Sequence, residues 1–481
     1  MTENKRVLLV RPAPVIDQFG DESFMPLGIA YIAAVLEREG YEVRVRDHII
    51  EPQPEAVFLR ETQEFNPIVV GFTAVTPVVN SAYRLSAKLK EIIPGLVTII
   101  GGPHATAMPD EGLLKGLDYV VRGEGEFTML ELMKNLTNPE GIRGLSYMKN
   151  GQPVHNPDRE FMSGEEMDKL PFPARHLFPD IHRYKGQEAL GSKVPCASIM
   201  TSRGCPFGCK FCYKAVFGKK FRARTPENIV AEIIYLKETY GVKEVAIVDD
   251  TFTSDVKRVI KFCDLLIEKK VNMRWSCPNG IRVDIGDLEM FKKMKKAGCY
   301  RTALGIESGS QRILDDIGKR ISLKEIEDTV SMLKKAHIKT MGFFMLGNLG
   351  ENKETMQETI DFAIRIKTDY AQFLLAIPYP GTALYEIVKR EGKFFIENWD
   401  EYGQYEGTAS FSHKEVTPEL MKEMGHKASR QYYLNPGYLF RQFINPETYA
   451  FLPRRLKVAA RIIMGKRAPI GAVNLLPTLA K

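Results

Sequence analysis

Short apolar runs alternate with amphipathic stretches over residues 1–140. In Gly28–Arg38, apolar side chains recur at helical spacing and form one stripe. Runs with the character of strands occur at Val7–Val10, Glu42–Arg46, Ile68–Thr73, Leu96–Ile100 and Tyr119–Val121. Strands that alternate with helices predict a parallel, doubly wound, Rossmann-like sheet. Ligands of such sheets bind beyond the carboxyl ends of the strands.

Residues 141–194 are polar with scattered Pro and Gly, which predicts a connector. Alternation resumes over 195–385, where Thr225-Pro226 and Gly241 mark the start and end of one helix. Strands are expected at Ala197–Thr201, Glu244–Val248, Met273–Ser276, Tyr300–Ile306, Thr340–Leu346 and Tyr370–Ile377. Six β/α units favour a partial (β/α)6, TIM-like barrel over a second open sheet, although periodicity alone does not decide between them. Residues 386–481 are helical and aromatic-rich, without a clear further strand.

Composition limits the class of protein. The chain has 481 residues, of which 44% are hydrophobic and 26% charged, as expected for a globular α/β protein of two or three domains. No apolar run reaches the length of a membrane span, and the charged N-terminus lacks the pattern of a signal peptide. We therefore expect a cytoplasmic protein. Seven cysteines in a chain of this length predict no disulfide framework.

Positive charge is concentrated near the C-terminus, although the net charge of the chain is only +7. Beyond Pro436, Glu447 is the only acid, against the basic residues Arg441, Arg454, Arg455, Lys457, Arg461, Lys466, Arg467 and Lys481. Within Pro453–Arg467 these alternate with apolar residues, as in a basic amphipathic helix that lies on anionic lipid. Ordinary packing of the apolar stripe on the barrel is the competing interpretation. No nucleic-acid-binding motif is present.

Three cysteines lie within eight residues in the segment Arg203-Gly204-Cys205-Pro206-Phe207-Gly208-Cys209-Lys210-Phe211-Cys212. Three thiolates on one loop suit an iron–sulfur cluster and leave one iron without a protein ligand, as a catalytic centre requires. Zinc would need a fourth ligand, usually from a second Cys pair, which this chain lacks. The dispersed cysteines are expected in the core, with a second cluster as the alternative; they are Cys196, Cys263, Cys277 and Cys299.

The C-x3-C-x2-C spacing, with the aromatic Phe211 before the last Cys, resembles the radical S-adenosylmethionine (SAM) superfamily. The resemblance implies a barrel, a [4Fe–4S] cluster on Cys205, Cys209 and Cys212, SAM chelated to the open iron, and a 5′-deoxyadenosyl radical. It also implies that SAM is contacted by Phe211, by Asp249 and Asp250 after the second strand, and by Glu307 and Ser308 after the fourth. Carboxylates suit the cationic parts of SAM. Each acid alone could instead be a helix cap or a loop carboxylate.

The first 140 residues resemble the cobalamin-binding domain that precedes the radical barrel in one large subfamily. Four segments carry this resemblance: Pro26-Leu27-Gly28, Gly71-Phe72-Thr73, Gly101-Gly102-Pro103-His104 and Val121-Arg122-Gly123-Glu124-Gly125-Glu126. The resemblance implies that the nucleotide tail of cobalamin inserts beside the sheet. Glycine lets the backbone approach the tail, and a hydroxyl can bond to it. The implied contacts are Thr73, Gly101, Gly102, Gly123 and Glu124.

The segment Arg11–Gly20 departs from the pattern of cobalamin mutases, since it lacks the histidine that ligates cobalt in their Asp-x-His-x-x-Gly motif. His104 could be proposed as a substitute, but a single His beside Gly-Gly-Pro is more typical of a hydrogen-bonding loop residue. We therefore expect cobalamin without a protein histidine on cobalt. A domain that has kept only its shape is the alternative.

Together these resemblances imply a cobalamin-dependent radical SAM enzyme that methylates an unactivated carbon or phosphorus. One SAM would methylate cobalt, and a second would give the radical that activates the substrate. An oxidative cyclase, or a lipid- or tetrapyrrole-modifying enzyme without methyl transfer, is the alternative. A non-enzymatic sensor is disfavoured because no signalling module is visible. The implied partners are a small-molecule or lipid substrate and an electron donor such as flavodoxin or ferredoxin. A peripheral membrane contact through the basic segment is a further option.

Overall fold

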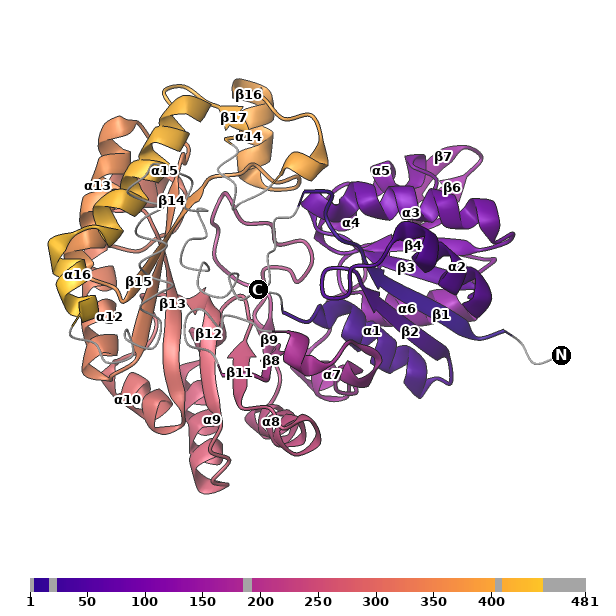
Figure 1. Cartoon of the computed structure of the whole chain (residues 1–481), viewed down its shortest axis with the longest axis horizontal. Coiled ribbons are helices and arrows are strands. Elements are labelled where there is room, and N and C mark those ends of the chain that lie inside the picture. The colour runs from indigo at the N-terminus through magenta and orange to yellow at the C-terminus, as the bar shows by residue number, and fades with distance from the viewer. Residues whose placement is uncertain (1–3, 17–23, 185–192, 403–408, 444–481) are drawn as a thin grey trace.

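The computed structural model describes residues 4–16, 24–184, 193–402 and 409–443. Two α/β units lie side by side, and the C-terminal helices α15 and α16 pack along the second of them (Figure 1). None of the helices in these ranges is both long enough and apolar enough to cross a membrane. The predicted basic amphipathic segment, Pro453–Arg467, lies outside the described residues.

The first sheet has seven strands in the order β2-β1-β3-β4-β5-β6-β7. Strands β1 to β5 are parallel, whereas β6 and β7 are antiparallel and extend the sheet past residue 140 into the expected connector. The strands are β1 Arg6–Arg11, β2 Glu42–Asp47, β3 Val69–Thr73, β4 Val97–Gly101, β5 Tyr119–Val121, β6 Leu145–Lys149 and β7 Gln152–His155. The helices are α1 Leu27–Arg38, α2 Glu55–Phe65, η1 Thr76–Val78, α3 Val79–Ile92, α4 Pro103–Ala107, α5 Pro109–Leu114 and α6 Gly125–Lys134.

Both faces of this sheet are buried. In β1, Val7 and Leu9 pack in one apolar cluster with α1 and α6, and Leu8 and Val10 pack in another with α2, α3 and α5. A strand covered on both faces is apolar at consecutive positions, as β1 is. The predicted doubly wound sheet is confirmed.

The second sheet has six parallel strands in the order β15-β14-β13-β12-β11-β8. Strands β8 and β15 are its edges, so the barrel is partial, as predicted. The strands are β8 Cys196–Ile199, β11 Glu244–Ile247, β12 Arg274–Ile281, β13 Cys299–Glu307, β14 Lys339–Leu346 and β15 Tyr370–Leu375. The helices are α8 Pro226–Tyr240, η5 Phe252–Ser254, α9 Val256–Glu268, α10 Leu288–Lys296, α11 Gln311–Asp316, α12 Leu323–Lys335, α13 Lys353–Ile366 and α14 Ala383–Glu391. The four dispersed cysteines are buried, as expected.

Smaller elements join and extend the two units. The connector holds α7 Gly164–Asp168, η2 Arg175–Leu177 and η3 Ile181–Arg183. Beyond the barrel lie η6 Trp399–Glu401, α15 Pro418–Tyr433 and α16 Pro436–Phe443. The expectation of no strand after residue 385 is wrong in one detail, since Lys393–Phe394 (β16) pairs with Phe411–Ser412 (β17). A two-residue ladder is too short to leave an alternating pattern in the sequence.

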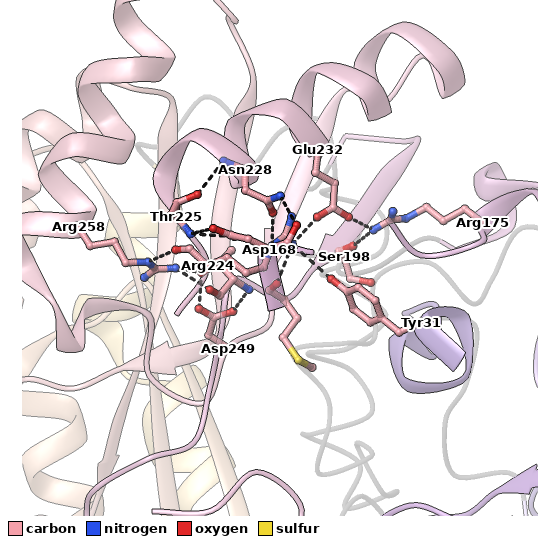
Figure 2. A network of polar contacts seen from close by, with 12 residues as sticks. Tyr31, Asp168, Arg175, Ser198, Arg224, Thr225, Asn228, Glu232, Asp249 and Arg258 are labelled. Carbon is pink, nitrogen blue, oxygen red and sulfur yellow. Dashed lines mark hydrogen bonds and ion pairs between the residues drawn. The ribbon is translucent and has the colours of Figure 1, made fainter. Parts of the chain in front are cut away.

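Glu232 of α8 is buried where the connector meets the barrel (Figure 2). Its carboxylate accepts hydrogen bonds from Arg175 of the connector at 2.8 Å and from Arg224 at 2.5 Å. Arg224 also donates to the hydroxyl of Tyr31 in α1, at 3.3 Å. Burial alone would raise the pKa of Glu232, but Arg224 and Arg175 together hold that pKa below its ordinary value. The network thus ties the first domain, the connector and the barrel together.

We expect Glu232→Gln to lower the free energy of unfolding by about 3–5 kcal/mol, because it leaves two buried guanidinium groups without a counter-charge. Urea denaturation followed by circular dichroism measures this change. Glu227→Gln, on the exposed side of the same helix, removes a surface ion pair to Lys261 and should cost less than about 1 kcal/mol. Equal effects of the two substitutions would show that the buried network does not hold the units together.

Candidate active site at the carboxyl ends of the strands

The three predicted cluster cysteines lie on one loop between two short strands, β9 (Ser202–Arg203) and β10 (Arg222–Ala223), which pair antiparallel. Gly204 begins the loop with a φ of +83°, and a side chain there would overlap the carbonyl oxygen of Lys220. The amide of Cys205 donates to the carbonyl of Gly218 at 3.3 Å. The loop therefore folds back on itself directly before the first cysteine.

Cations surround the thiols. Burial raises the pKa of Cys209, while Lys319, Lys214 and Arg282 act in the opposite direction. Desolvation raises the pKa of Cys212 to about 12, again opposed by Lys214. The Nζ atom of Lys214 is buried and has no hydrogen-bond partner within the described chain. Thiols must lose their protons to bind metal, and nearby cations favour that loss.

Among the residues that the structure describes, no three His, Cys, Asp or Glu side chains are arranged as ligands of a single ion. The fit to an iron–sulfur cluster rests instead on three thiols in one loop, the cations around them and the unpartnered ammonium of Lys214. This donor set suits an anionic thiolate cluster.

Glu307 lies beside the cysteine loop, at the end of β13. Its carboxylate pairs with Lys319 at 2.8 Å, and a side chain at Gly305 would lie within 2.9 Å of both partners. Burial would lower the pKa of Lys319, but Glu307 and Cys209 raise it above its ordinary value. Glu307 has a φ of +71°, a strained backbone conformation that is concentrated at functional sites. The structure therefore brings Glu307 and the thiols together, as predicted.

The adjacent acids Asp249 and Asp250 differ in their surroundings. Asp249 is buried and accepts hydrogen bonds from the backbone amide of Thr201 at 2.6 Å and from the Ser202 hydroxyl at 2.5 Å. Arg258 also donates to the carbonyl of Thr201, at 2.9 Å. These contacts assign Asp249 to holding the start of the cysteine loop, and its predicted contact with SAM finds no support in this geometry.

Asp250 is exposed and acts electrostatically on Cys212. Desolvation and the neighbouring Asp249 raise the pKa of Asp250, against a hydrogen bond from the backbone of Gly204. Of the two acids, only Asp250 keeps its carboxylate accessible beside the thiols, so it matches the expectation for an acid that meets a cationic ligand.

Ser308 and Phe211 also belong to the predicted SAM site. Ser308 is fully buried, and its hydroxyl lies 3.0 Å from that of Thr359 in α13 and accepts from the amide of Ser310. This hydroxyl is fully used within the protein, which does not support a contact with SAM. Phe211 is half-buried against the core of the barrel.

Three of the five residues predicted to bind cobalamin meet at one edge of the first sheet. Thr73 ends β3 and Gly101 ends β4, with Gly102 next to both. Gly102 has a φ of +99°, and a side chain there would lie 2.8 Å from the carbonyl oxygen of Ala74 and 3.3 Å from the hydroxyl of Thr73. This close approach needs glycine. The half-buried hydroxyl of Thr73 thus lies beside the backbone of Gly102, which carries no side chain. This arrangement fits the expected contact with a nucleotide tail.

The other two residues predicted to bind cobalamin, Gly123 and Glu124, face the cysteine loop of the barrel. Gly123 approaches the carbonyl oxygen of Val216 in the cysteine loop, so that a side chain there would lie 3.8 Å from it. Glu124 is buried and pairs with Arg203 at 3.1 Å and with Arg222 at 2.9 Å. The prediction that Glu124 binds cofactor is therefore not supported, because both arginines of the barrel occupy its carboxylate.

His104 is buried, with both ring nitrogens facing protein groups. Nδ1 lies 3.2 Å from the hydroxyl of Thr76, and Nε2 lies 3.5 Å from the carboxylate of Glu111. The indole of Trp399, from beyond the barrel, donates to the same carboxylate at 2.9 Å. Sequence reasoning missed Trp399, Arg203, Arg222, Lys214 and Lys319 as residues of the site, because single side chains whose partners are distant in the chain follow no periodic pattern.

Two family descriptions match this chain: "B12 binding domain" over residues 21–133 and "Radical SAM superfamily" over residues 199–363. An uncharacterized methyltransferase of Pyrococcus horikoshii is 34% identical over 94% of this chain and 96% of its own length. The chain belongs to the radical SAM superfamily. Cytidylyl-2-hydroxyethylphosphonate methyltransferase of Streptomyces wedmorensis is 30% identical, over 81% of this chain and 82% of that protein.

The fold of this radical SAM enzyme is also found in TsrM, a radical SAM methyltransferase from Kitasatospora setae whose structure holds cobalamin and a [4Fe–4S] cluster. The two structures align with a TM-score of 0.69 over 83% of this chain and 85% of TsrM, at 18% sequence identity. Both predicted domain folds are thereby confirmed in a single known architecture.

The turn after β14 of the radical SAM barrel contains a buried acid, Glu351. One carboxylate oxygen accepts from the amides of Gly347 at 2.6 Å and Asn348 at 2.8 Å, while the other is buried without a partner in the described structure. Burial raises the pKa of Glu351 to about 8, although both amides act to lower it. We therefore expect Glu351 to be protonated in the folded enzyme at neutral pH.

Below pH 4.5, both the folded and the unfolded chain carry the proton of Glu351. Because the pKa of Glu351 is raised in the folded state, only the folded chain carries this proton between pH 4.5 and about 8. Between pH 4.5 and about 8, this group lowers the stability by up to about 1.4 kcal/mol per pH unit. We expect Glu351→Gln, a neutral mimic, to remove that slope, so that its advantage over the wild type grows with pH. Denaturation from pH 5 to 8 measures it, with the exposed Glu354→Gln as control. Parallel curves for wild type and Glu351→Gln would contradict a protonated Glu351.

For the SAM site, we expect Asp250→Asn and Glu307→Gln to weaken binding of SAM to cluster-loaded enzyme by about ten- to a hundredfold, since each loses a charged hydrogen-bond partner. Asp249→Asn should instead lower the iron retained after gel filtration, because it loosens the start of the cysteine loop. Equilibrium dialysis with labelled SAM and iron analysis separate the two effects. Asp328→Asn, on the exposed face of α12, is the control. Unchanged affinity in both site variants would remove these acids from the SAM site.

Proposed function

We propose that this radical SAM enzyme is a cobalamin-dependent methyltransferase that acts on an unactivated carbon or phosphorus. One observation carries the proposal. A side chain at Gly381, in the turn after β15, would overlap the ring of Tyr213, next to Cys212, and would lie 3.2 Å from Ala107 in the helix that follows Gly101-Gly102. The cysteine loop and the predicted cobalamin edge therefore approach each other at one junction, as transfer between two cofactors requires.

When bound, the cluster and SAM supply a 5′-deoxyadenosyl radical, and cobalamin supplies the methyl group; these cofactors carry the difficult chemistry. In this proposal Cys205, Cys209 and Cys212 hold three irons, and Asp250 with the Glu307–Lys319 pair orients SAM. Thr73 and Gly102 line the site of the nucleotide tail. His104 stays within the protein, because Thr76 and Glu111 face its two nitrogens.

Aromatic side chains gather beside this junction between the cysteine loop and the predicted cobalamin edge. Trp399 and Tyr402 meet edge to face with ring centroids 4.9 Å apart, and Tyr379 lies 6.2 Å from Tyr402. Large apolar rings at this position favour the exclusion of water from a radical reaction. The proposal further includes a small-molecule or lipid substrate, a flavodoxin- or ferredoxin-type electron donor, and a cytoplasmic setting.

The test is anaerobic reconstitution with iron, sulfide and hydroxocobalamin, followed by incubation with a protein-free cell extract, methyl-labelled SAM and dithionite as the electron donor. We expect 5′-deoxyadenosine, S-adenosylhomocysteine and one labelled product detected by mass spectrometry. The variant with Cys205, Cys209 and Cys212 all replaced by Ala should give none of the three. 5′-Deoxyadenosine with an unlabelled product would favour the cyclase or oxidase alternative. Failure to retain cobalamin through gel filtration would contradict the cofactor assignment.

A further inference from the structure

A cluster of buried ion pairs joins the first domain to the cysteine loop of the barrel. Glu124 and Glu126 follow β5, and Arg203 and Arg222 lie on the two strands that close the cysteine loop. Glu124 pairs with Arg203 at 3.1 Å and with Arg222 at 2.9 Å, and Glu126 pairs with Arg203 at 2.6 Å. All four side chains are at most 5% exposed. Two carboxylates of one domain thus neutralise two guanidinium groups of the other.

The remaining contacts of these arginines fix their orientation. Arg203 lies over the rings of Tyr31 at 5.5 Å and Phe217 at 5.3 Å, and Arg222 lies over Phe161 at 4.9 Å. Arg222 also donates to the carbonyl of Phe217 at 2.6 Å, inside the cysteine loop. Planar guanidinium groups held by carboxylates and stacked on aromatic rings have little freedom to rotate.

The backbone pairing at the base of the cysteine loop is short. Strands β9 and β10 form a ladder of only two residue pairs, Arg222 with Arg203 and Ala223 with Ser202. A ladder this short is marginal by itself. Arg203 stands two residues before Cys205, so movement of its guanidinium displaces the first predicted iron ligand.

We infer that Glu124 and Glu126 are positioning residues of the radical SAM site, which fix the cysteine loop from the cobalamin-type domain. The same turn also contacts the neighbouring turn after β4, since the amide of Gly123 donates to the hydroxyl of Thr106, which itself donates to the carbonyl of Gly102. The inference goes beyond the proposed function and holds whether or not cobalamin binds, because it concerns the geometry of the loop in the protein alone.

Hydrogen–deuterium exchange on the full-length, metal-free chain tests this inference. Glu126→Gln removes one charge with little change in shape, and Glu124→Gln removes the shared counter-charge. We expect amides between residues 202 and 223, including those of Cys205 and Arg222, to exchange at least tenfold faster in both variants. Protection in β1 to β4 should stay at the wild-type level.

The matched control is Glu244→Gln, at the opposite end of the barrel strands. Glu244 is fully buried and pairs with Arg274 at 3.3 Å and with the hydroxyl of Tyr300 at 2.8 Å. Its loss should lower thermal stability without changing exchange in the cysteine loop. Faster loop exchange in Glu244→Gln equal to that in Glu126→Gln would overturn the inference, because general destabilisation would then explain both.

A second readout uses the reconstituted cluster without cobalamin. We expect Glu126→Gln to bind iron and sulfide as the wild type does, yet to give a broader electron paramagnetic resonance signal for the reduced cluster and a weaker response to SAM. A wild-type signal together with wild-type exchange in both glutamate variants would overturn the inference. Loss of cobalamin binding in the wild type would affect only the proposed function.

Discussion

The neutralisation of Arg203 and Arg222 by Glu124 and Glu126 is the interaction on which the arrangement of the two domains depends. A buried guanidinium without a counter-charge is destabilising by several kcal/mol, so neither domain can move away without hydrating these charges. The network around Glu232 also holds the two domains together, at the point where the connector meets the barrel. It joins Glu232 to Arg175 and Arg224, and Arg224 to Tyr31. Two polar networks, both buried, thus set where the carboxyl ends of the two sheets lie relative to each other.

The backbone is strained at several positions near the carboxyl ends of the two sheets. Gly102 and Gly204 adopt positive φ angles where neighbouring backbone leaves no room for a side chain, and Glu307 adopts one without being glycine. An unfavourable conformation of this kind persists only where the surroundings impose it, here through the ion pair to Lys319 and the paired strands β13 and β14. These three positions lie beside the expected cofactors, so the backbone geometry of the site depends on the fold around it.

The side chains that the sequence predicts as cofactor contacts fall into two groups: those that lie beside the thiols and those that are bonded within the protein. Asp250 and Glu307 have carboxylates beside the thiols, and that of Glu307 also pairs with Lys319. The carboxylates of Asp249 and Glu124 and the hydroxyl of Ser308 are bonded to other parts of the chain. The latter group holds the loops that carry the former. We expect substitution of either group to lower activity, but for different reasons: loss of the proposed contact with SAM in one case, and displacement of the cysteine loop or its supports in the other.

The sequence by itself determined the two parallel sheets, because apolar alternation reports local burial, and it determined the three-thiol loop, because its ligands are close in the chain. Glycines at Gly101 and Gly102 were likewise visible, since they mark turns. Only the tertiary structure decided which acids lie beside the thiols and which are bound by distant segments. The partner of Glu124 is 79 residues away, and that of Asp249 is 48 residues away. A local pattern shows that a side chain is charged, but the charge that it meets depends on how distant segments pack.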